Sequence, residues 1–480
     1  MFLPKEYNSP KKRVKFLGGV TVHKAPEGLL FSRRDVIRII LPLVAEQFLA
    51  MFVGMADSVM VAGVGEAAVS AVSLVDSISV LLINLFAALA TGGAVVAGQY
   101  LGAQNVKKAC RVADQLVILI FLISAVVTAA LFFLRNLLLS TVFGTITQEV
   151  MGYAQTYFTI TLFSIPFIAL YNGGAAIFRT MADSRTPMLI SFLMNALNIG
   201  GNALLIFGFH MKIEGAAIPT LVSRMVAAVV VLALLRRPKY LLHFSRPFSF
   251  RLQLHTVGRI LGIGIPNGVE NAMFQFGKII VVSLISSFGT VAITANAVGN
   301  AIGVFQILPG MAIGMASVPI ISRCYGAGES KQIRYYATRL LAMAFAFNIL
   351  LNLAFTLAIP LFLQLYQLTE ETRSLATWVL LFSAVVSSCP WPSAFMFPNV
   401  FRATGDVKYT MIVSVVSMWI FRVGLSYLLG GSLGLGLQGV WYGMAADWVC
   451  RSVCFIARYF SKSWRRRISA PAPAATPQKA

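Results

Sequence analysis

Long apolar runs recur along this 480-residue sequence and constrain its fold more than any other feature. Each run has roughly 20 or more residues, the length that crosses a ~30 Å hydrocarbon core as a helix. Backbone groups in lipid must be satisfied within the segment, and no alternating pattern indicates a β-barrel, so helices are required. We predict an all-α polytopic membrane protein with twelve spans, at residues 37–64, 67–97, 112–134, 150–178, 187–208, 215–235, 257–285, 290–320, 336–363, 373–400, 409–430 and 437–459.

Composition agrees with a membrane protein, because 58% of the residues are hydrophobic and only 12% are charged. The net charge of +22 is placed mainly in the tails and in alternate connections, which indicates topology rather than nucleic-acid binding. Both termini should then be cytoplasmic. We expect basic tails at 1–35 and 461–480, a cytoplasmic linker at 236–256, and contact with anionic lipids in the plasma (inner) membrane.

Cysteine and histidine give little sign of metal or redox chemistry. The five cysteines form no C-x-x-C pair, and the four histidines lie in tails, loops or span ends. A membrane-buried haem or a histidine proton relay is therefore not expected, and neither is any cofactor.

The sequence repeats itself. Residues 41–110 align without a gap on 265–334 at a shift of 224, so that Pro42 and Glu46 fall on Pro266 and Glu270. FRTMADSRTPML (178–189) likewise aligns with FRATGDVKYTMI (401–412). We predict two six-helix lobes, 36–235 and 257–460, related by a pseudo-twofold axis along the membrane normal. This is an alternating-access plan, and without a phosphate-binding loop an ion gradient is the natural energy source.

Polar side chains collect at one depth in the N-terminal lobe. With a rise of about 1.5 Å per residue, Asp57 lies roughly 13 Å below the outer end of its span, Asn202 and Asn198 about 12 and 18 Å, and Thr220 about 9 Å. Asp76 lies about 15 Å deep, and Asn195 shares a helix face with the other two asparagines. Such oxygen ligands suit Na⁺, and a dry carboxylate can alternatively take up a proton.

The duplication provides a control for this polar set. At the repeat positions, Asp57, Asp76, Asn198 and Thr220 are replaced by Val281, Asn300, Phe421 and Met444. The helical scaffold was duplicated, but these polar residues were not. This pattern is expected for a single cation site in a protein with two symmetric lobes. The alternative to a cation site is a structural role in which these side chains form hydrogen bonds between helices. We favour this role for Asn195 and for Thr220 taken alone.

Other charges within the spans are open to two interpretations. Glu46 and Glu270 follow a proline by one turn and could serve the fold or a proton path. Asp447 and Arg451 should neutralise each other at i, i+4. The cations Lys278, Arg224 and Arg422 could pair with an acid across helices or meet an anionic substrate. Pro392 and Pro398 predict a bend in the tenth span.

Several motifs together resemble the multidrug and toxic compound extrusion (MATE) family: MADSVMVAGVG (55–65), GQYLGAQN (98–105), FRTMADSRTPM (178–188), LNIGGNALLIFG (197–208) and EGAAIPT (214–220). The resemblance implies two V-shaped lobes and export of organic cations or other amphipathic compounds in exchange for Na⁺ or H⁺. It implies a cation site at Asp57, Asn198, Asn202 and Thr220, and only weakly a coupling role for Glu270.

Competing functions remain at this stage. A flippase for anionic lipid-linked saccharides would want several cations in the cleft, for which Lys278, Arg224 and Arg422 are modest support. A polytopic membrane enzyme would need a catalytic cluster that the spans do not display, and a channel would not use two lobes in this way. We therefore expect an antiporter, not an enzyme, acting as a monomer on small amphipathic molecules.

Overall fold

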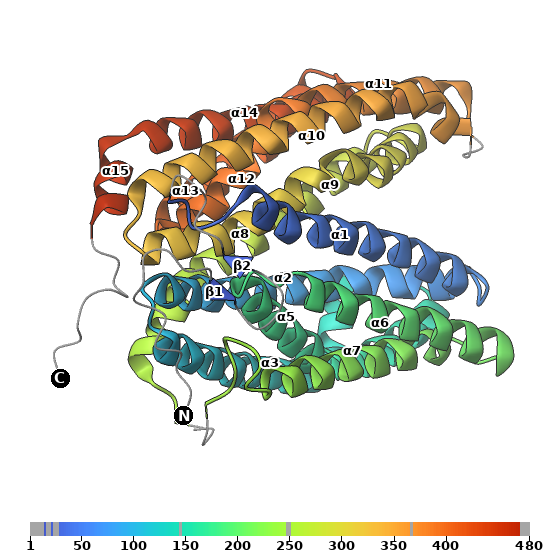
Figure 1. Ribbon diagram of the computed structural model, residues 1–480. Helices are drawn as coiled ribbons and strands as arrows, with labels where there is room; N and C mark the ends of the chain where they lie inside the picture. Colours follow the sequence, from blue (N-terminus) through green and yellow to red (C-terminus); the bar gives the residue numbers. More distant parts are fainter. Residues whose placement is uncertain are drawn as a thin grey trace. The chain divides into compact units, whose positions relative to one another are not determined.

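The computed structural model describes residues 14–15, 21–22, 28–143, 146–245, 251–364 and 368–470, and these ranges are almost wholly helical (Figure 1). The only strands among the described residues are β1 (Val14–Lys15) and β2 (Thr21–Val22), which pair antiparallel and have two residues each. Much of the predicted tail 1–35, the end of the tail 461–480 and the middle of the linker 236–256 lie outside the described residues.

Two compact units divide the chain, Met1–Ile265 and Pro266–Ala480. Unit 1 contains α1 (Arg33–Ala62), α2 (Glu66–Gly102), α3 (Val106–Phe143), α4 (Gln148–Leu162), α5 (Ile165–Thr180), α6 (Arg185–Asn202), the π-helix η2 (Ala203–Gly208) and α7 (Glu214–Leu235). Helix α8 (Leu254–Ser286) begins in unit 1 and continues into unit 2. Unit 2 further contains α9 (Thr290–Gly326), α10 (Ser330–Gln364), α11 (Glu370–Ser388), α12 (Pro390–Ala403), α13 (Val407–Ser417), η3 (Met418–Gly424), η4 (Ser426–Ser432), α14 (Gly436–Phe460) and α15 (Lys462–Ser469).

The twelve predicted spans correspond to these helices. Nine spans in the described residues are long and apolar enough to cross a membrane, and two bent pairs, α4 with α5 and α11 with α12, raise the number to eleven. Helix α14, with 25 residues, occupies the predicted twelfth span, 437–459, but is not among these eleven. The bend in the tenth span is 46° and falls between Ser388 and Pro390, earlier than the two prolines from which we predicted it. Pro398 lies inside the continuous helix α12.

Each unit is built around one deeply buried helix. In α2 nearly every residue from Ala88 to Tyr100 is buried, and in α9 nearly every residue from Gly310 to Gly326. Small residues allow this close packing, because a Cβ on Gly93 would come within 2.4 Å of Leu116. Continuous apolar sequence on all sides of these two helices is what a buried position requires.

Backbone conformation repeats at four turns, even where the residue differs. The shared feature is a positive φ, the left-handed region that favours glycine. The pairs are Gly65 (136°) with Gly289 (90°), Gln104 (59°) with Gly328 (74°), Ala182 (65°) with Gly405 (78°), and His210 (52°) with Gly434 (71°). Both units therefore make the same turns, and unit 1 makes three of them without glycine.

Candidate functional site

Helices α1 and α6 bring Asp57 and Asn202 into direct contact. The Asn202 Nδ2 group donates a 2.8 Å hydrogen bond to Asp57 Oδ1. Asn202 lies at the last turn of α6, where the helix passes into η2, and its side chain is only 1% exposed. The Asp57 carboxylate, near the C-terminal end of α1, is thus held by a neighbouring helix.

Asn198, one turn earlier on α6, lies between Asp57 and Thr220. With its amide nitrogen turned toward the carboxylate, it donates to Asp57 Oδ1 at 2.9 Å and to Oδ2 at 3.1 Å. Its oxygen then accepts from the Thr220 hydroxyl at 3.0 Å. This orientation satisfies both ends of the amide, which is how an amide is assigned. The predicted set Asp57, Asn198, Asn202 and Thr220 therefore forms one connected group within unit 1.

The donor set of this group fits a hard cation. Two carboxylate oxygens, the carboxamide oxygens and the Thr220 hydroxyl are oxygen ligands of the kind that such cations prefer. Asn202 Oδ1 is buried and accepts no hydrogen bond from any residue that the structure describes, so it is available as one of these ligands. Among the described residues no three His, Cys, Asp or Glu side chains gather, which leaves Asp57 as the one full negative charge of this four-residue set.

A second polar set lies near the first. Asp76 on α2 hydrogen-bonds Tyr157 on α4. Arg224 on α7 donates a 2.7 Å hydrogen bond to Ser164 Oγ and interacts electrostatically with both Asp57 and Asp76. Arg224 is therefore within electrostatic range of both acids, but among the described residues its hydrogen bond is to Ser164 and it forms no ion pair with either acid. Sequence reasoning missed Tyr157 and Ser164, because neither is a charged residue in an apolar span.

Asn195 does not join the group formed by Asp57, Asn198, Asn202 and Thr220. Its side chain is buried, 7% exposed, and its Nδ2 atom has no partner among the described residues. It lies one turn before Asn198 on the same face of α6, but no hydrogen bond to Asp57 is formed.

Glu46 and Glu270 each form a buried ion pair with arginine. Glu46 Oε1 lies 2.7 Å from Arg179 Nη2, which links α1 to α5. Glu270 Oε2 lies 2.7 Å from Arg402 Nη2, which links α8 to α12. The two arginines are themselves repeat partners in the FRTMAD and FRATGD segments. Duplicated partners favour a structural role for both acids.

Unit 2 carries a cluster of cations around Asp447. Arg451 Nε lies 2.8 Å from Asp447 Oδ1, as the i, i+4 spacing predicted, and Arg422 Nε lies 3.4 Å from Oδ2. The Arg422 guanidinium also packs 5.0 Å from the Phe274 ring centre. Lys278, one turn beyond Phe274 on α8, is exposed and interacts electrostatically with Arg422. The cluster thus holds three cations and one carboxylate.

The chain's relatives are transporters. The family model MatE matches twice, over residues 42–204 and 266–428. The uncharacterized transporter YisQ of Bacillus subtilis is 28% identical over 457 residues, 92% of this chain and 97% of that protein. The probable multidrug resistance protein NorM of Thermotoga maritima is 24% identical over 448 residues, 91% and 94% of the two chains.

Solved structures share the fold. A MATE protein in complex with MaD3S superposes with a TM-score of 0.82 at 22% identity, covering 91% of this chain and 96% of that one. An outward-facing MATE transporter superposes with a TM-score of 0.81 at the same identity and coverage.

The repeated six-helix units and the two family matches define the class: this is a multi-pass membrane transporter with the MATE fold. The chain belongs to the MatE family.

Proposed function

We propose that the protein is a secondary active antiporter that exports amphipathic compounds, organic cations among them, in exchange for Na⁺ or H⁺ by alternating access. The observation that supports this most directly is the Asp57 carboxylate, which accepts hydrogen bonds from the amides of Asn202 and Asn198. Relatives named probable multidrug resistance proteins agree with export of such compounds.

The coupling step follows from which atoms face Asp57. A charged carboxylate accepts from both amide nitrogens. When a proton neutralises it, one oxygen becomes a donor and only the other still accepts readily, and when a cation binds, amide oxygens are required where the amide nitrogens now face the carboxylate. The Asn198 amide must then turn, which returns its nitrogen to Thr220 as a 3.0 Å donor. Ion binding therefore changes how α6 contacts both α1 and α7, and a ligand that binds one arrangement better shifts the equilibrium between them.

Efflux from reconstituted vesicles under separately imposed gradients tests the proposal. Wild-type protein should export a fluorescent cationic dye when a Na⁺ gradient or a proton gradient is present, and the gradient that drives efflux identifies the ion. Asp57→Asn should abolish driven efflux while membrane insertion and folding persist. Glu149→Gln is the control, because Glu149 is an exposed acid on α4 outside both polar sets. Full retained transport by the Asp57 variant would overturn the proposal.

We further propose that the protein works as a monomer in the plasma (inner) membrane with both termini cytoplasmic. The distribution of Lys and Arg between alternate connections supports this orientation. Cysteine labelling from each side of intact cells, at single cysteines introduced near Lys108 and near His210, tests it.

A further inference from the structure

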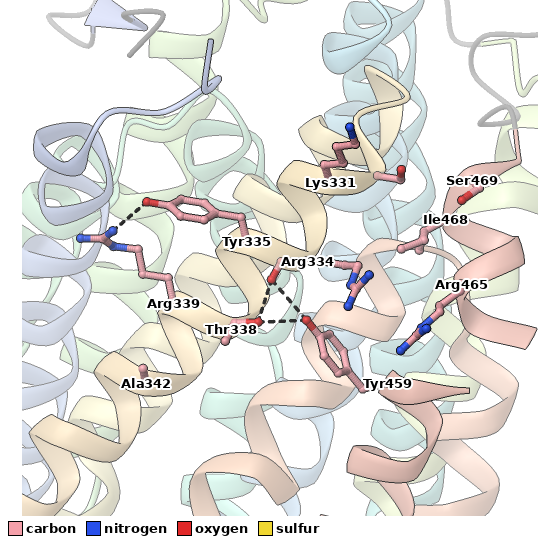
Figure 2. A pocket seen from close by; sticks show the side chains of 11 residues that line it. Lys331, Arg334, Tyr335, Thr338, Arg339, Ala342, Tyr459, Arg465, Ile468 and Ser469 are labelled. Atoms are coloured by element: carbon pink, nitrogen blue, oxygen red, sulfur yellow. Dashed lines mark hydrogen bonds between the residues drawn. The ribbon is translucent and has the colours of Figure 1, made fainter. Parts of the chain in front are cut away.

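A basic cavity in unit 2 has no place in the proposed antiport mechanism. It has a volume of about 670 Å³ and is lined by residues from the start of α10, the end of α14 and the short helix α15. Figure 2 shows Arg334 on α10 and Arg465 on α15 extending toward the same space beside Tyr459. Lys331 adds a third cation, and no acidic residue lines the cavity.

Three of the cavity's four cations are exposed and free to bind an anion. Lys331, Arg334 and Arg465 are exposed, and no ion pair is formed by any of their side chains among the described residues. The fourth cation, Arg339, is different, because it donates a 2.7 Å hydrogen bond to the Tyr335 hydroxyl. Three positive charges facing one space repel each other, so an anion bound there is stabilising.

Helix α15 is held firmly in position beside the cavity. Its Trp464 and Ile468 are 0% and 2% exposed, and Trp464 Nε1 donates a 3.3 Å hydrogen bond to Thr404 Oγ1. Helix α15 follows α14 after the single residue Ser461, whose side chain caps it. Arg465 therefore projects from a packed helix and is pre-positioned across from α10.

The lining of the cavity extends along α10 from a basic start to one apolar residue. Lys331 and Arg334 lie near its first turns and Arg339 lies further along, and the lining ends at Ala342, 11 residues beyond Lys331 and about 16 Å further along the helix axis. A free phosphate would fill only the basic end. A phospholipid fills both ends of the cavity, because its headgroup phosphate contacts the cations while its glycerol and first acyl carbons lie along α10. The cavity also lies at the ends of two membrane-spanning helices, where headgroups are found.

We propose that this cavity binds the headgroup of an anionic phospholipid through Lys331, Arg334 and Arg465, and that the bound lipid ties α15 to α10. Tyr459 adds a hydroxyl at the site and is itself fixed, because it donates to the Arg334 carbonyl oxygen at 3.3 Å. Basic cavities between membrane helices are a known type of lipid-headgroup site.

The test measures phosphatidylglycerol binding to the full chain in phosphatidylcholine nanodiscs. Each cation near a headgroup contributes about fivefold in affinity, so Arg465→Gln should weaken binding about fivefold and the Arg334→Gln, Arg465→Gln double variant roughly 25-fold. Arg466→Gln is the matched control, with the same charge change on the neighbouring residue of α15, which does not line the cavity. It should bind like the wild type.

Two results would overturn the proposal. One is an equal loss of binding in the Arg465 and Arg466 variants, which would mean general surface charge. The other is equally tight binding of glycerol 3-phosphate in detergent, which would mean a soluble phosphate ligand. None of these measurements involves transport, so they stand apart from the antiport proposal.

Discussion

Thr220 donates a 3.0 Å hydrogen bond to the carboxamide oxygen of Asn198, and this bond keeps the amide nitrogen facing Asp57. Replacing Thr220 with valine removes the donor and keeps the side-chain shape. A typical hydrogen bond contributes about 1 kcal/mol, so the apparent affinity for the coupling ion should change roughly fivefold. Ion titration of driven efflux measures it. Thr220→Ser retains the hydroxyl and should behave like the wild type; an equal change in both variants would mean that packing, not the bond, matters.

Lys278 is exposed beside the buried Arg422, and it should attract substrates that carry a carboxylate. Rhodamine 110 has a free carboxylate and rhodamine 123 is its methyl ester, so the pair differs mainly in that charge. We expect Lys278→Gln to weaken binding of rhodamine 110 about fivefold and to leave rhodamine 123 nearly unchanged, measured by fluorescence anisotropy on purified protein. A similar loss for both dyes would argue against electrostatic recognition.

The Glu46–Arg179 ion pair should stabilise unit 1, because both side chains are largely buried, 9% and 17% exposed. Glu46→Gln leaves an uncompensated guanidinium, and we expect a loss of about 3 kcal/mol in the free energy of unfolding. Thermal unfolding in detergent measures it. The double variant Glu46→Met with Arg179→Met removes both charges and should recover most of the loss. No recovery would mean that the pair acts through its geometry rather than through its charges.

Ala182 has a φ of 65°, where its repeat partner Gly405 has 78°. Ala182→Gly should therefore raise the free energy of unfolding by roughly 0.5–1 kcal/mol, because the left-handed conformation costs alanine about that much. Gly405→Ala should lower it by about 1 kcal/mol. A Cβ at Gly405 would meet nothing closer than Arg467 at 3.9 Å, so the effect belongs to the backbone. Shifts of the same sign in both variants would contradict this account.

Gly439 on α14 packs directly on backbone. A Cβ there would lie 2.5 Å from the Gly430 nitrogen on η4, and backbone cannot move aside as a flexible side chain can. Gly439→Ala should cost roughly 2–3 kcal/mol by overpacking and lower the yield of folded protein. Gly200→Ala is the comparison, because nothing lies within 4 Å of its Cβ position. Size-exclusion profiles of the two variants compare their yields of folded protein.

Much of this architecture is predictable because its causes are local. Runs of apolar residues set the spans, and helical rise sets the depth at which Asp57, Asn198 and Asn202 meet. Contacts between side chains on different helices are harder to predict, because helical periodicity does not indicate which acid pairs with which base. The duplication does contain such a signal: Glu46 and Arg179 both recur, as Glu270 and Arg402, and a pair repeated together is a candidate contact.

Turns and breaks were less predictable. Left-handed backbone is expected at glycine, so Gly65 and Gly289 are unsurprising, whereas Gln104, Ala182 and His210 adopt it because the turn around them requires it. The break between α4 and α5 at Ser164 had no obvious marker other than Pro166, which is compatible with a helix start. These features are set by tertiary packing rather than by local preference.

The buried ion pairs of each unit also indicate where the chain could be divided into two fragments. Glu46 is neutralised within unit 1, and Glu270 and Asp447 are neutralised within unit 2. A cut in the loop between α7 and α8 would therefore leave none of these three buried acids without its arginine. Each fragment keeps these acids together with their arginines, so two separately translated halves could each form these ion pairs during assembly, and a gene encoding half of this protein is a physically reasonable ancestor.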